Sequence, residues 1–114
     1  MKIIGKDIEN YLNSISEASP LKRDNNDYLI SYRLTSGKEV AFDPRTTRKA
    51  SIFIGVLPEN LNEISGIGEI VKYPPQKPST ALKRVSSQLD NLSVKYKVDL
   101  TSLDGLSKII SAQI

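Results

Sequence analysis

Two short segments in which apolar and polar residues alternate, separated by a turn that contains glycine, constrain the fold of this chain more than any other feature. The alternation runs through Tyr28–Leu34 and resumes in Lys38–Asp43. A period of two residues is typical of β-strands. Gly37 in the turn Thr35-Ser36-Gly37 accommodates the positive φ that a short hairpin needs. The sequence therefore predicts an antiparallel β-hairpin at this position.

Two periodicities predict the remaining helices and strands. Apolar residues spaced three or four apart indicate amphipathic helices, and short alternating runs that end at proline indicate strands. We expect strands at Ser51–Leu57 and Glu69–Tyr73, a connector at Lys95–Asp99, and helices at Asp7–Ser19, from Ser79 or Thr80 to Ser93, and from Thr101 or Ser102 through Ile110.

The connections between these elements are too short for parallel crossovers, which favours an antiparallel sheet. The predicted fold is α+β, with a small antiparallel sheet of three or four strands preceded by one helix and followed by two helices packed on it. The length of 114 residues is typical of one domain, so residues 1–114 are expected to form a single domain.

Two residue types are missing, and their absence limits the chemistry. The sequence has no cysteine and no histidine, which excludes disulfides, thiolate metal sites and nucleophilic triads that depend on histidine. It also lacks a glycine-rich phosphate loop that ends in Lys-Ser or Lys-Thr. We therefore expect a protein that is not an enzyme and that uses no metal or cofactor. Without a long apolar run or a signal peptide, a cytoplasmic location is expected.

The positive charge is distributed unevenly along the chain. Residues 1–44 contain six basic and seven acidic side chains, whereas residues 45–114 contain ten basic and six acidic ones, within a net charge of +3. The second part of the chain therefore carries the positive charge, which favours an anionic partner.

The segment Pro44–Ser51 is the first candidate binding site. It lies between two predicted strands and combines three cations with three hydroxyl groups and no acid. Guanidinium, ammonium and hydroxyl groups all donate hydrogen bonds to phosphate oxygens. The alternative is a solvated connection whose charges oppose aggregation at a sheet edge. The candidate residues are Arg45, Thr46, Thr47, Arg48 and Lys49.

A second candidate site lies between Glu69 and Asp90, where the sequence has no acidic residue. Hydroxyl groups at the start of the predicted helix precede two adjacent cations there, and the N-terminus of a helix attracts anions. The alternative is an ordinary capped helix with a basic, solvated face. The candidate residues are Lys72, Lys77, Ser79, Thr80, Lys83 and Arg84.

Two weaker patterns accompany these candidates. Tyr73 follows Lys72, and Tyr96 lies between two lysines, as in proteins that stack single-stranded bases on aromatic rings. The alternative is that most aromatic residues belong to the core. The segment Leu61–Gly68 resembles the hairpin of the helix-hairpin-helix family, but Pro74-Pro75 would end the second helix that this family requires, which favours a loop between strands.

These observations predict a binding domain without enzymatic activity for an anionic partner, nucleic acid first and DNA rather than RNA. Phosphate contacts would come from the two basic segments. The alternative from a different class is a small protein-binding inhibitor or adaptor, including one encoded by a mobile element, whose cations face an acidic protein surface. The oligomeric state stays open.

Overall fold

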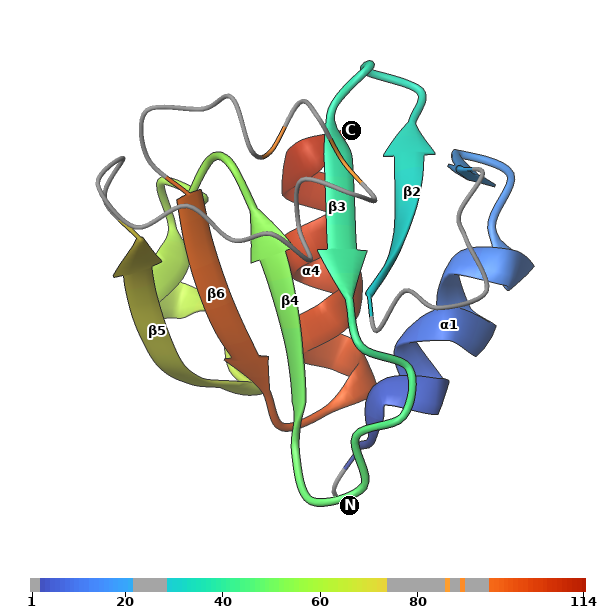
Figure 1. The fold of residues 1–114 in the computed structure, drawn as a ribbon. Helices are drawn as coiled ribbons and strands as arrows, with labels where there is room; N and C mark the ends of the chain where they lie inside the picture. Colours follow the sequence, from blue (N-terminus) through green and yellow to red (C-terminus); the bar gives the residue numbers. More distant parts are fainter. Residues whose placement is uncertain (1–2, 22–28, 74–85, 87–88, 90–94) are drawn as a thin grey trace.

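In a computed structural model, the strands of this chain form one six-stranded sheet in which all neighbouring strands are antiparallel (Figure 1). The structure describes residues 3–21, 29–73, 86, 89 and 95–114. The strand order is β1-β2-β3-β4-β6-β5. The elements are α1 (Gly5–Ser14), β1 (Ala18–Pro20), β2 (Ile30–Leu34), β3 (Glu39–Phe42), β4 (Ala50–Ile54), the 3-10 helix η1 (Leu61–Glu63), β5 (Ile67–Tyr73), β6 (Lys95–Leu100) and α4 (Leu103–Gln113).

The predicted hairpin is confirmed. β2 and β3 pair in the register Tyr32↔Val40, and two backbone hydrogen bonds of 2.8 Å, Leu34 N to Lys38 O and Gly37 N to Leu34 O, close the turn. Gly37 has a φ of 91°, a left-handed conformation that glycine adopts at little cost. The strands expected near β4 and β5 are also present, with their bounds shifted by up to three residues.

The expected sheet of three or four strands followed by two helices is wrong. The six-stranded sheet includes β1, a strand that begins inside the last turn of the predicted first helix. Helix α1 already ends at Ser14, and Ala18 then pairs with Leu34 at the edge of the hairpin. An edge position suits Pro20, since proline has no N–H to donate to a second neighbour.

The connector expected at Lys95–Asp99 is the other missed strand. β6 lies between β4 and β5 and pairs with both. Its apolar side chains Tyr96, Val98 and Leu100 contact the core, while charged residues alternate with them on the opposite face. Most of the predicted helix that ends at Ser93 lies outside the described residues. Within the part of the chain that the structure describes, α4 is the one α-helix that follows the sheet.

The two α-helices of the described residues contribute to a single large core on one face of the sheet. Ile8 and Leu12 of α1, and Ile109 and Ile110 of α4, are fully buried in it. Figure 1 shows α4 behind β3 and β4, with α1 beside β2. No helix among the described residues is long and apolar enough to cross a membrane. Together these elements define an α+β fold.

The opposite face of the sheet is covered only in part. Leu29, Ala41 and Leu89 form a small second cluster on it, with Phe53 packed against them. Because of this cover, all four residues of β3 are buried, on both faces. β5, at the edge of the sheet, contains no buried residue. The face opposite the helices is therefore closed over β2 and β3 and more open toward β5.

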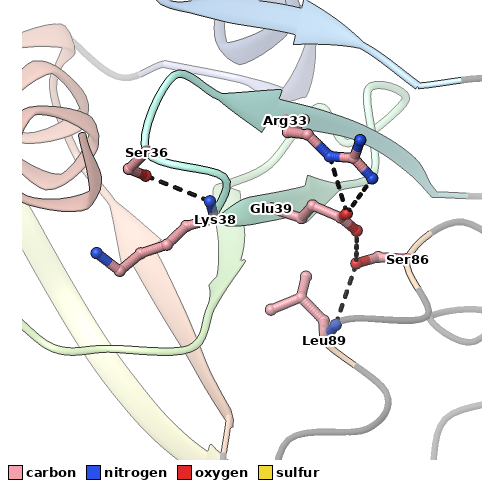
Figure 2. A network of polar contacts seen from close by, with 6 residues as sticks. All are labelled: Arg33, Ser36, Lys38, Glu39, Ser86 and Leu89. Carbon is pink, nitrogen blue, oxygen red and sulfur yellow. Dashed lines mark hydrogen bonds and ion pairs between the residues drawn. The ribbon is translucent and has the colours of Figure 1, made fainter.

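A polar network accompanies this second cluster (Figure 2). Glu39 is 5% exposed, and its carboxylate accepts hydrogen bonds from the Arg33 guanidinium, at 2.8 and 3.2 Å, and from the Ser86 hydroxyl at 2.7 Å. Ser86 Oγ in turn accepts from the backbone N–H of Leu89 at 3.2 Å. These bonds satisfy a buried carboxylate, which would otherwise be costly to desolvate.

Helix α4 starts at a close contact between two glycines. Ser102 caps the helix through a 3.1 Å hydrogen bond from Gly105 N, which confirms one of the two predicted caps. A Cβ atom on Gly105 would collide with the backbone of Gly66, which has a φ of 86°. Gly105 thus lowers the intrinsic helix propensity of α4 but permits the close approach of the helix to the loop before β5.

Candidate anion-binding loop

The connection between β3 and β4 lies at the end of the sheet near the start of α1 (Figure 1). It surrounds a shallow surface cavity of about 450 Å³. All residues that line it come from this connection, residues 43–49, which we call the β3–β4 loop. Five of them are the residues of the first sequence-predicted basic segment. The lining residues are Asp43, Arg45, Thr46, Thr47, Arg48 and Lys49.

The loop is held against the first turn of α1. Gly5 N donates a 3.0 Å hydrogen bond to Thr46 O, and a Cβ atom on Gly5 would collide with the carbonyl oxygen of Asp43. The Thr46 hydroxyl donates to the same carbonyl oxygen at 3.3 Å. Close packing of backbone against backbone therefore determines the path of the loop.

Asp43 orients the first cation of the loop. Its carboxylate accepts hydrogen bonds from Arg45 N at 2.9 Å, Arg45 Nε at 3.1 Å and Arg45 Nη2 at 3.2 Å. Partial burial by itself raises the pKa of Asp43, but the hydrogen bonds and the positive charge of Arg45 outweigh this effect and lower the pKa from its usual 3.8. Arg45 is thereby fixed while its side chain stays 62% exposed.

The lowered pKa of Asp43 predicts a small acid sensitivity. The carboxylate is bound more strongly in its charged form in the folded protein, so its stabilisation is complete above pH 3.8 and is lost as the pH falls below that value. Because Arg45 is exposed, we expect less than about 1 kcal/mol. Chemical denaturation between about pH 5 and 3 should show a shallower loss of stability for Asp43→Asn than for the wild type; an identical loss would contradict this role.

The remaining two cations differ in their contacts. Lys49 Nζ lies 3.2 Å from Asp99 Oδ2, and the Ser51 hydroxyl donates to Asp99 Oδ1 at 2.5 Å. The Lys49 side chain is nevertheless 63% exposed. Arg48 is exposed and makes no hydrogen bond or ion pair within the part of the chain that the structure describes. Arg48 is therefore the cation of this loop that is most available to an external anion.

The structure separates Lys72 from this loop. Lys72 pairs with Tyr96, whereas Ala50, which follows the loop, pairs with Leu100. Four residues of β6 correspond to about 13 Å along the strand, so Lys72 lies toward the opposite end of the sheet. The other predicted site residues lie outside the described residues, and they are Lys77, Ser79, Thr80, Lys83 and Arg84.

The charge of the described residues is balanced. They contain ten basic and ten acidic side chains, so the net charge of +3 comes from the segments that the structure does not describe. No group of three or more Asp and Glu residues that could hold a metal ion occurs among the described residues. Any attraction of an anion to the described surface must therefore arise locally, at exposed cations such as those of the β3–β4 loop.

Three residues that shape the site were not recognised from the sequence, namely Gly5, Asp43 and Asp99. Asp43 had a local signal, because an aspartate two residues before Arg45 can form a turn by accepting its backbone N–H. Gly5 and Asp99 are about 40 and 50 residues away along the chain, and only the tertiary structure brings them to the loop.

The chain was compared with protein-family models, curated proteins and solved structures, and none of them matches it.

Proposed function

We propose that this chain binds nucleic acid, DNA in preference to RNA, through phosphate contacts at the β3–β4 loop. The observation that supports this proposal best is the lining of the surface cavity, in which three exposed cations and two threonines from one short loop surround the same hollow. Arg and Lys side chains together with hydroxyl groups are the usual donors to phosphate oxygens.

The ion pairs in the loop are compatible with this role. Arg45 and Lys49 are each paired with an aspartate, but their side chains are 62% and 63% exposed. Exposed ion pairs contribute at most about 1 kcal/mol, so a phosphate can compete for these cations. Arg48 needs no such exchange, because none of the described residues binds it. We therefore expect Arg48 to contribute most of the affinity.

The proposal is tested by binding of labelled oligonucleotides, measured by fluorescence anisotropy at two salt concentrations. We expect binding that weakens steeply with salt, because each neutralised phosphate releases counterions. The double variant Arg48→Ala/Lys49→Ala should bind about tenfold more weakly and lower the salt slope by about two on duplex DNA. Its thermal stability should stay close to that of the wild type, because it removes only exposed side chains.

A matched control separates a local site from net charge. The double variant Lys38→Ala/Lys108→Ala removes the same charge from two other surface cations. As in the loop variant, one of them, Lys38, has no ion pair among the described residues, and the other, Lys108, is paired with an aspartate, Asp104. This control variant should bind almost as well as the wild type. Equal losses in the two double variants would contradict a site at the β3–β4 loop. Absence of any nucleic-acid binding at low salt would overturn the proposal and favour the protein-binding alternative.

A further inference from the structure

The face of the sheet that is opposite the helices has an open half next to the β3–β4 loop. Over β2 and β3 this face is closed by the cluster of Leu29, Ala41 and Leu89. Over β4, β6 and β5 most of its side chains, including Ser51, Phe53, Tyr73, Lys97 and Asp99, are only partly buried. This half combines two aromatic rings with charged and hydroxyl-bearing residues.

Phe53 and Tyr73 meet above β6. Their ring centroids are 5.8 Å apart with an angle of 50° between the ring planes. β4 and β5 are both neighbours of β6, so their backbones are about 10 Å apart and both side chains must lean over the strand between them. In the strand register Phe53 lies opposite Lys97, and Tyr73 lies opposite Lys95. The two rings therefore form a small aromatic platform between two lysines.

The two lysines beside this platform differ. Lys95 is 3% exposed, and its ammonium group donates a 3.3 Å hydrogen bond to Leu89 O. Lys97 is partly exposed and lies between Phe53 and Val71 in the register, and its side chain makes no hydrogen bond or ion pair within the described ranges. Lys97 is thus the cation that is available to an anion next to the aromatic platform.

A continuous path connects the platform to the β3–β4 loop. Along β4, Ser51 lies on the same face as Phe53 and is two residues closer to the loop, and its hydroxyl binds Asp99, which also binds Lys49. Successive residues on one face of a strand are about 7 Å apart. Along this face the aromatic rings and Lys97 therefore come first, followed by Lys49 and then by the rest of the loop. We call this arrangement the β4–β6 path.

We propose that the β4–β6 path binds single-stranded nucleic acid, with a base stacked on the Phe53–Tyr73 platform and the adjoining phosphates on Lys97 and Lys49. This inference rests on the proposed function of the loop and specifies its ligand further. Stacking on a protein ring requires an unpaired base, whose face a duplex does not offer. Aromatic rings beside cations in an open groove are the common arrangement for binding single strands without base preference.

The experiment compares two probes with equal numbers of phosphates, a thymidine oligonucleotide and an abasic oligonucleotide of the same length. The wild type should bind the thymidine probe about tenfold more tightly than the abasic probe, because stacking adds to the phosphate contacts. Tyr73→Leu should abolish this preference and leave abasic binding unchanged, whereas Tyr73→Phe should keep it. A uridine probe of the same length shows whether RNA uses the same platform.

A second variant keeps the test decisive if Tyr73→Leu lowers the thermal stability. Lys97→Gln removes the positive charge but keeps a polar side chain, and it should lower the salt slope on a single strand by about 0.7. Equal affinity of the wild type for the thymidine and abasic probes, or tighter binding of a duplex, would overturn the stacking inference and leave the phosphate site intact. Failure to bind every probe, the duplex included, would overturn the proposed function itself.

Discussion

Replacing Gly105 with alanine is expected to destabilise this protein by about 2 kcal/mol, although alanine is the best helix former and glycine one of the worst. The added Cβ atom would collide with the backbone of Gly66. That backbone cannot move freely, because Gly66 O accepts a 2.8 Å hydrogen bond from Thr101 N. Overpacking lowers the free energy of unfolding by up to about 3 kcal/mol, and the better helix propensity of alanine offsets about 1 kcal/mol of this loss. Chemical denaturation measures the difference.

The control for Gly105→Ala is Ser111→Ala in the same helix. Ser111 is exposed and its hydroxyl makes no hydrogen bond with another described residue, so this change should stabilise α4 by a few tenths of a kcal/mol through helix propensity alone. If Gly105→Ala stabilised the protein as Ser111→Ala does, the close contact between α4 and Gly66 would be absent in solution. The slope of the denaturation curve should stay the same in both variants.

Removal of the Glu39 carboxylate is the second change with a large expected effect. Glu39→Ala leaves the hydroxyl of Ser86, a residue that is 2% exposed, without its acceptor and breaks the pair with Arg33. A buried polar group without a partner costs about 1–3 kcal/mol. The pair with Arg33 adds less, because the Arg33 side chain is 58% exposed. We expect a total loss of about 2 kcal/mol in the free energy of unfolding.

Glu39→Gln separates the shape of this network from its charge. Its amide oxygen still accepts a hydrogen bond from Ser86, so the loss should be about half that of Glu39→Ala. A double-mutant cycle with Ser86→Ala measures the coupling between the two residues, which contact each other directly at 2.7 Å. Additive effects would show that Ser86 does not depend on the Glu39 carboxylate.

The sequence predicted an element correctly where its periodicity agreed with a local signal at its end, such as a turn or a helix cap. The β2–β3 hairpin combines strict alternation with Gly37, and α4 combines a cap at Ser102 with a regular apolar stripe. β6 was predicted to be a connector although charged and apolar residues alternate regularly along it, so its local pattern was a signal for a strand that the sequence reading missed. β1 was missed because a three-residue strand exists only through its partner, β2.

For the candidate site, the sequence predicted which residues make up the loop, but it did not predict which of the cations are paired with acidic residues. The cluster Arg45–Lys49 is visible in the sequence as a segment without acids. The structure adds Asp43 and Asp99, which neutralise two of its three cations and leave Arg48 as the cation without a partner among the described residues. The platform of Phe53 and Tyr73 was also beyond sequence reasoning, because two strands and a shared neighbour bring the rings together.

By itself, the sequence determined the α+β character, the central hairpin and the position of a cationic loop, because backbone periodicity, turn conformation and side-chain charge are local properties. Only the tertiary structure decided the number of strands, the place of β6 between β4 and β5, and the contact of α4 with Gly66. These depend on pairings between distant residues, whose free energy comes from burying shared surface rather than from any short segment.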